Sequence, residues 1–168
     1  MPRNEEDLKK EILKAQESAD IASLYVLEEE AHSVFTEDDM HGYYANILDL
    51  ALENLTNALE SHRKMDMQEV QDFATTRALY EYAMEHYSEE AIKDASALFE
   101  VLSGLTNDAK FSSALKLHWI ATLENISLDD FISKIADIEL TQSNCTFYIS
   151  SFTKEAQLLL DNAKIETE

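Results

Sequence analysis

Glutamate and histidine side chains form the first pattern in this sequence that could do chemistry. Glu29 and His32 have a Glu-x-x-His spacing, which places both side chains on one face of a helix. Di-iron carboxylate bundles use that motif twice, together with a glutamate from each of two further helices. The sequence has no second Glu-x-x-His, and Glu29 belongs to the acidic run 28–30. We therefore interpret the pair as part of a solvated acidic helix end, with a metal-binding helical bundle as the alternative.

Nucleophiles and phosphate-binding loops are the next candidates, and neither has its usual surroundings. Cys145 follows the polar stretch TQSN, which is typical of a loop, and no histidine lies near it in the sequence. A reactive thiolate needs a cationic or basic neighbour. Gly42 and Gly104 are the only glycines, so there is neither a glycine-rich phosphate loop nor a Gly-x-Ser-x-Gly elbow. These absences predict a protein that is not an enzyme and has no cofactor.

The charge of the chain limits its partners. The 168 residues include 34 acidic and 13 basic side chains, a formal charge of −21. Nucleic acids and anionic membrane surfaces are recognised by Lys and Arg, so neither is an expected partner. Between Lys14 and Arg63 there is no Lys or Arg, whereas eleven residues are acidic. This acidic stretch could be solubilising, could bind a basic or aggregation-prone partner, or could mimic the charge of a nucleic acid.

Features that report on location point to the cytoplasm. The N-terminal stretch MPRNEEDLKKEILK is charged and amphipathic and lacks the apolar core of a signal peptide. No run of residues approaches the 18 or so apolar positions that a spanning helix needs, so membrane insertion is not expected. A single cysteine excludes an internal disulfide and suits a reducing compartment. We expect a cytoplasmic protein.

The composition predicts an all-α fold. Hydrophobic residues make up 45% of the chain, enough for a core, whereas two glycines and one proline are too few for the turns of a β protein. We expect about six to seven helices in one domain. Residues 1–66 would form an N-terminal helical region and residues 67–168 tetratricopeptide-like helical hairpins, with an irregular helical bundle as the alternative.

The N-terminal region is expected to hold two long helical segments. The first runs from Glu5 to about Phe35, with a break near Asp20. Its apolar residues follow a coiled-coil-like seam, which could pack on the domain or form a homodimer: Leu8, Ile12, Ala15, Ala19 and Ala22. Thr36 begins a capping-box pattern, and a second helix follows to about His62.

The remaining helices are predicted from apolar periodicity and capping residues. Their expected ranges are 67–87, 89–105, 108–125, 128–139 and 147–165. Gly104 would cap the second of these and Ser127 would begin the fourth. The stretch TQSNC, residues 141–145, is expected to be a loop.

From Leu79 onward, apolar and small residues follow the order of a tetratricopeptide repeat. Ala83 and Ala95 take the two small positions at which the helices of such a repeat approach closely, and Phe99 is the aromatic residue four positions later. Residues 111–140 repeat the shape, with Trp119 and a phenylalanine at the small positions. We therefore predict helix-packing roles for Ala83, Ala95, Phe99 and Trp119.

Residues 78 to about 165, beginning ALYEYAMEHYSEEAIKDASALFEVLSGL, resemble the tetratricopeptide chaperones of type III secretion. That family is small and strongly acidic, has a helical region before about three repeats, and holds translocator proteins in the cytosol. The resemblance implies a non-enzymatic chaperone or adaptor that binds a partner protein or peptide.

Repeat proteins of this kind bind extended peptides on a concave face. Aromatic and histidine side chains of the repeat-like region are the candidates for such a face, and Tyr80 and Tyr87 are expected to be the more exposed of them. The predicted partner-binding residues are Tyr80, His86, Tyr87 and His118.

Overall fold

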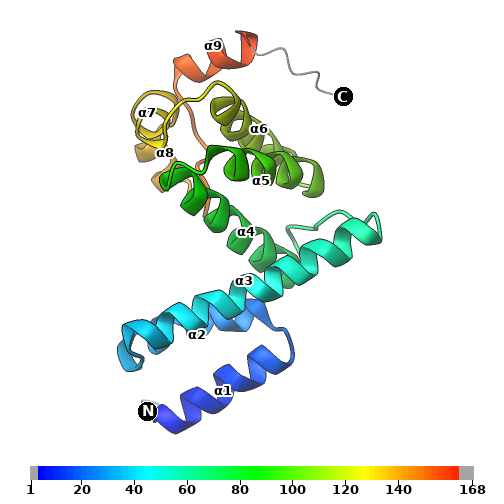
Figure 1. Cartoon of the computed structure of the whole chain (residues 1–168), viewed down its shortest axis with the longest axis vertical. Helices are drawn as coiled ribbons and strands as arrows, with labels where there is room; N and C mark the ends of the chain where they lie inside the picture. Colours follow the sequence, from blue (N-terminus) through cyan, green and yellow to red (C-terminus); the bar gives the residue numbers. More distant parts are fainter. Residues whose placement is uncertain (1–3, 163–168) are drawn as a thin grey trace. The chain divides into compact units, whose positions relative to one another are not determined.

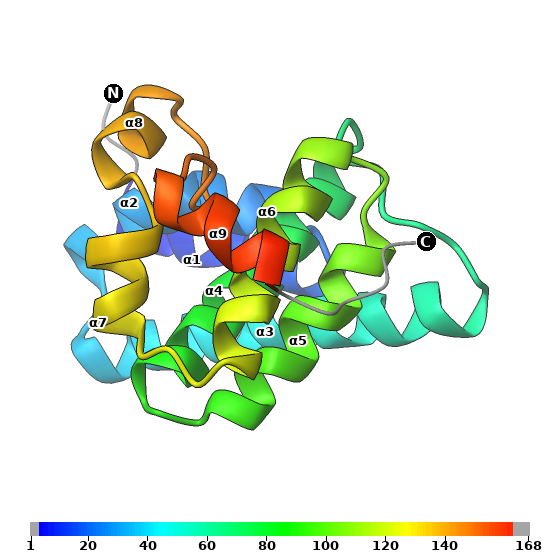
Figure 2. The same ribbon diagram turned by 90° about the horizontal axis from the view of Figure 1, so that it is seen from above.

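The computed structural model describes residues 4–162 of the chain, and the fold is all-α, as predicted (Figures 1 and 2). Among these residues there are nine α-helices, one π-helix and no strand, the only β-type pairing being an isolated bridge between Ala136 and Phe152. The elements are α1 (Glu5–Glu17), α2 (Ile21–Val34), α3 (Glu37–Glu60), α4 (Val70–Ser88), α5 (Ile92–Leu105), α6 (Ala109–Leu123), α7 (Leu128–Asp130), the π-helix η1 (Phe131–Ile135), α8 (Ile138–Ser143) and α9 (Lys154–Asn162).

The chain divides into two compact units, residues 1–79 and 80–168, and the division falls inside α4. The boundary predicted from the sequence lies after residue 66, before α4 begins. The first half of α4 belongs to unit 1 because polar side chains bind it there. Gln71 Nε2 donates to Asp20 Oδ1 at 2.6 Å, and Asn54 Nδ2 donates to Thr75 Oγ1 at 3.0 Å.

Unit 1 begins with three helices whose starts are set by side-chain caps. The side chains of Asn4, Asp20 and Thr36 accept hydrogen bonds from backbone N–H groups in the first turns of α1, α2 and α3. The predicted break near Asp20 and the predicted cap at Thr36 are therefore confirmed. Apolar side chains from the three helices are buried between them, among them Leu8, Ile12, Leu24, Leu27, Tyr43 and Ile47.

The predicted seam of the first helix is wrong beyond Ala15. Leu8, Ile12 and Ala15 are buried, but Ala19 is exposed and has a φ of 55°. Ala19 lies in the turn that separates α1 from α2, so the helical spacing cannot continue through it. The extended seam proposed for a homodimer therefore does not exist as one surface.

Several helices end on a non-glycine residue in the left-handed conformation. These residues are Ala19, His62, Glu90, Asn125 and Cys145, with φ between 54° and 65°. The first four form the paired backbone hydrogen bonds of a Schellman motif, for example Ala19 N–H to Gln16 and Asp20 N–H to Ala15. Gly104 is not such a cap, contrary to the prediction: it lies within α5, and Thr106 ends that helix in an extended conformation.

Unit 2 is built around α5 and α6, which form its most extensive helix pair. Figure 2 shows α9 lying against α6, and α9 also contacts η1. The core is unusually aromatic, with Tyr87, Phe99, Phe111 and Phe131 among its largest buried side chains.

The C-terminal elements differ from the predicted ones. The helix expected over 128–139 is instead the single turn α7 followed by η1, and the chain becomes extended at Ala136. Asp137 then caps α8, which takes in the first three residues of the expected loop 141–145. The last predicted segment begins as a strap, residues 146–153, before α9 starts at Lys154. Its final residues, 163–165, lie outside the described residues.

Candidate functional site

Two of the four residues expected to bind a partner form a buried polar network in unit 2. Tyr80, from α4, and His118, from α6, lie with the Tyr80 oxygen 2.7 Å from His118 Nε2. His118 Nδ1 is 2.7 Å from the Ala114 carbonyl oxygen, which can only accept, so the proton lies on Nδ1. Nε2 therefore accepts from the Tyr80 hydroxyl. The same hydroxyl accepts the N–H of Ile149, in the strap, at 3.0 Å.

Aromatic rings enclose this network. The His118 ring centroid lies 4.9–5.3 Å from the centroids of Tyr80, Phe99 and Phe131. Burial lowers the pKa of His118 to about 4, against a smaller opposing effect of its hydrogen bond to Ala114. Burial likewise raises the pKa of Tyr80. His118 is thus a neutral histidine that joins α4, α6 and the strap.

The expectation that Tyr80 and Tyr87 are exposed is wrong. Their exposed fractions are 3% and 2%, and the Tyr87 hydroxyl donates to the Ile126 carbonyl oxygen at 2.6 Å. His118 is also buried, so three of the four predicted binding residues belong to the core. The fourth, His86, is half-buried and lies against Tyr82, with ring centroids 4.3 Å apart.

The residues predicted to pack helices differ in how far they are buried. Ala83, Ala95 and Phe99 are buried completely, and Trp119 is half-buried. Phe99 packs between the rings of Tyr80 and Tyr87, so α5 meets α4 through these aromatic side chains.

The Glu-x-x-His pair lies on the exposed surface of α2. His32 Nε2 is 2.8 Å from the Tyr44 hydroxyl, which donates to a carboxylate oxygen of Glu28. His32 is therefore the donor to Tyr44. Within residues 4–162 no group of three or more His, Cys, Asp and Glu side chains is arranged to hold a metal ion. Glu29 and His32 thus have no further ligands beside them in the described part of the chain.

An apolar groove lies between α2 and α4 in unit 1. It has a volume of about 380 Å³, and its lining is apolar apart from Gln68, Arg77 and the Tyr25 hydroxyl. Val70 is 66% exposed and Phe73 is 42% exposed, although both are large hydrophobic residues. The complete lining is Ala22, Tyr25, Met67, Gln68, Val70, Phe73, Ala74 and Arg77. We call this set the α2–α4 groove.

Contacts beside the α2–α4 groove fix its two walls against each other. The Gln71 side chain donates to Asp20 and accepts the Ala22 N–H at 3.3 Å. Hydrogen bonds from Ser23 and from Gln71 lower the pKa of Asp20, so this carboxylate stays charged and keeps its partners. The Arg77 guanidinium lies 4.0 Å from the centroid of the Tyr25 ring and 3.9 Å from Glu28. The α2–α4 groove is therefore preformed.

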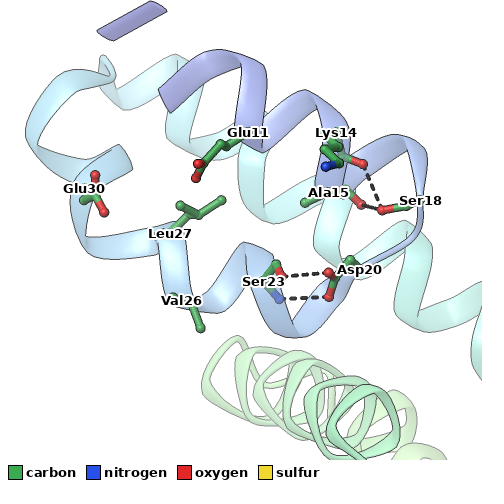
Figure 3. A pocket seen from close by; sticks show the side chains of 9 residues that line it. All are labelled: Glu11, Lys14, Ala15, Ser18, Asp20, Ser23, Val26, Leu27 and Glu30. Carbon is green, nitrogen blue, oxygen red and sulfur yellow. Dashed lines mark hydrogen bonds between the residues drawn. The ribbon is translucent and has the colours of Figure 1, made fainter. Parts of the chain in front are cut away.

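A second hollow of similar size, about 360 Å³, lies between α1 and α2, and its lining mixes the apolar residues Ala15, Val26 and Leu27 with six charged or polar ones (Figure 3). Figure 3 shows Asp20 paired with Ser23 at one end and the carboxylates of Glu11 and Glu30 toward the other. Charged and hydrogen-bonded groups of this kind are poor contacts for an apolar ligand. The α2–α4 groove is thus the better candidate for binding apolar side chains.

Sequence reasoning missed the α2–α4 groove. The residues of its two walls are about fifty positions apart in the sequence. From the sequence alone, the apolar residues of α2 have the pattern of an ordinary buried helix face, and only the position of α4 shows that some of them line a groove. The one local signal is the cluster Met67, Val70 and Phe73, which surrounds the start of α4 with apolar side chains.

No protein-family model matches this chain, and comparison with curated proteins and with solved structures gives no match. In the described part of the chain, no helix has the length and apolar character required to cross a membrane.

Proposed function

We propose that this protein is a non-enzymatic binding module that holds an apolar segment of a partner protein in the α2–α4 groove. The observation that carries the proposal is the exposure of Val70 and Phe73 on the wall of a preformed apolar hollow. Covering large apolar side chains with a partner is favourable by about 25 cal/mol for each Å² removed from water. Exposed apolar patches of this kind commonly mark interaction sites.

The wider role that we propose is that of an acidic cytoplasmic chaperone or adaptor. A chaperone must bind apolar segments while staying soluble itself, and a formal charge of −21 suits that requirement. The resemblance to the chaperones of type III secretion is part of the same proposal. We place the binding surface in unit 1, however, and not in the repeat-like region as predicted from the sequence, because Tyr80, Tyr87 and His118 are buried.

A photo-crosslinking experiment tests the proposal in the native host. A photoreactive phenylalanine analogue replaces Phe73, on the α2–α4 groove, or Leu59, an exposed apolar residue of α3 outside it. We expect a discrete adduct with a partner protein from position 73 and none from position 59. Equal adducts from both positions, or none from position 73, would overturn the proposal.

A further inference from the structure

We infer that the segment held in the α2–α4 groove is a cationic amphipathic α-helix of another protein. This inference rests on the proposed function and adds the chemical class of the partner. Two properties of unit 1 lead to it: the hydrogen-bonding state of the walls of the α2–α4 groove, and the charge around them.

The walls cannot satisfy the backbone of an extended peptide. Both walls are α-helices, whose backbone N–H and C=O groups are bonded within the helix except at their ends. At the helix starts that line the α2–α4 groove, the Ala22 N–H is bonded to the Gln71 side chain and the Phe73 N–H to the Glu69 carbonyl. The polar side-chain groups of the lining are Gln68, Arg77 and the Tyr25 hydroxyl, and Arg77 already contacts Tyr25 and Glu28. An extended segment would therefore bury unpaired amides, which is costly. A helix satisfies its own amides and presents apolar side chains at i, i+3/i+4 and i+7.

Charge around the α2–α4 groove favours cationic flanks on that helix. Residues 1–79 contain 18 acidic and 7 basic side chains, a formal charge of −11. Glu28 and Glu29 follow the α2 wall, with Glu28 3.9 Å from Arg77, and Asp66, Glu69 and Asp72 surround the start of the α4 wall, with Asp72 in an ion pair with Arg63. Lys and Arg on the polar face of the bound helix would be attracted to these carboxylates, whereas Glu or Asp would be repelled.

The test uses three fluorescent peptides of about 18 residues, roughly five helical turns. Two share one apolar stripe and differ only in carrying Lys or Glu on the polar face; the third has the Lys composition with the apolar positions scrambled. Fluorescence anisotropy measures their binding to the full chain. We expect the Lys peptide to bind at least about tenfold more tightly than either of the others.

Substitutions separate binding in the α2–α4 groove from general attraction to an acidic protein. Val70→Asp and Phe73→Asp each add a negative charge and remove an apolar contact, while Leu59→Asp adds the same charge elsewhere. Val70 is the first residue of α4, where an aspartate is compatible with the helix dipole, so this variant should fold. We expect Val70→Asp and Phe73→Asp to weaken binding of the Lys peptide about tenfold and Leu59→Asp to leave it unchanged.

The outcomes distinguish failure of this inference from failure of the proposed function. The Glu peptide could bind as tightly as the Lys peptide or more tightly, and Phe73→Asp could abolish that binding. This outcome would show that the partner is not cationic, while the α2–α4 groove would remain the binding site. Binding of the Lys peptide that is equally strong in Val70→Asp, Phe73→Asp and Leu59→Asp is surface attraction and overturns both. Self-association of the free chain that Phe73→Asp abolishes, measured by sedimentation velocity, assigns the α2–α4 groove to a second copy and also overturns the inference.

Discussion

The Tyr80 hydroxyl lies 2.7 Å from His118 Nε2 in the core of unit 2, and it donates to that nitrogen while accepting the N–H of Ile149. A histidine and a tyrosine that looked like ligand-binding residues are thus a structural connection among α4, α6 and the strap. The surface that we propose for partner binding is elsewhere, at the α2–α4 groove. The first two predictions follow from this connection.

Stability should fall with acid because His118 is neutral in the folded chain. Its folded pKa of about 4 lies below the usual 6.5, so between these values the unfolded chain binds more protons and the free energy of unfolding decreases as the pH falls. Keeping His118 neutral therefore contributes about 3 kcal/mol to the free energy of unfolding above pH 6.5, and this contribution is lost by pH 4. Urea unfolding gives the free energy of unfolding of wild type and of His118→Gln. The difference between the two values should become smaller as the pH falls from 6.5 to 4. Parallel curves would contradict the assignment, because the carboxylates titrate equally in both proteins.

Tyr80→Phe should destabilise unit 2 more than Tyr87→Phe. Removing the Tyr80 hydroxyl leaves both His118 Nε2 and the Ile149 N–H without partners in a buried site, at a cost of about 2–4 kcal/mol. Tyr87→Phe loses one hydrogen bond to the Ile126 carbonyl, at about 1 kcal/mol. Denaturant unfolding gives both values, and hydrogen exchange at Ile149 should accelerate only in Tyr80→Phe. Equal losses in the two variants would refute the network.

The small residues of α4 and α5 should not tolerate enlargement. Ala83 and Ala95 have no exposed surface, so a leucine at either position overpacks the core and costs about 1–3 kcal/mol or more. Ala97→Leu, on the exposed side of α5, is the matched control and should change the free energy of unfolding by less than about 0.5 kcal/mol. A tolerated leucine at both buried positions would show that close packing there is not required.

Glycine should stabilise the chain at two helix ends. Ala19 and Glu90 adopt φ of 55° and 65°, a conformation that is unfavourable for residues with a Cβ. Ala19→Gly and Glu90→Gly should each raise the free energy of unfolding by about 0.5–1 kcal/mol, whereas Ala97→Gly inside α5 should lower it by about 1 kcal/mol. Thermal unfolding measures all three changes. Destabilisation by glycine at positions 19 and 90 would contradict the described backbone there.

The all-α class and several helix starts could be predicted because they depend on local chemistry. Thr36, Asp108 and Ser127 each accept a backbone N–H at a helix start close to the expected position. The helix expected over 128–139 begins where predicted but ends at Ile135, because Ala136 becomes extended and pairs with Phe152 and Asp137 begins a new helix. Tertiary packing outweighs local helical periodicity there.

The candidate sites depended on contacts between distant residues, which local patterns do not contain. Tyr80 and His118 are 38 positions apart, and only their pairing explains why two polar aromatic side chains are buried. The walls of the α2–α4 groove are brought together by Gln71, whose partners Asp20 and Ala22 precede it by about fifty positions. Predicting either feature would have required the arrangement of α4 against α2 and α6.

The most direct test of the account is methyl NMR of the full chain titrated with the Lys-bearing amphipathic peptide. We predict that the methyl resonances of Ala22, Met67, Val70 and Ala74, which line the α2–α4 groove, shift on binding. Those of the exposed residues Val34 and Ala97, outside the α2–α4 groove, should stay in place. A saturating titration that shifts Val34 or Ala97 and leaves the four methyl-bearing groove residues unchanged would contradict the assignment of the α2–α4 groove as the binding site.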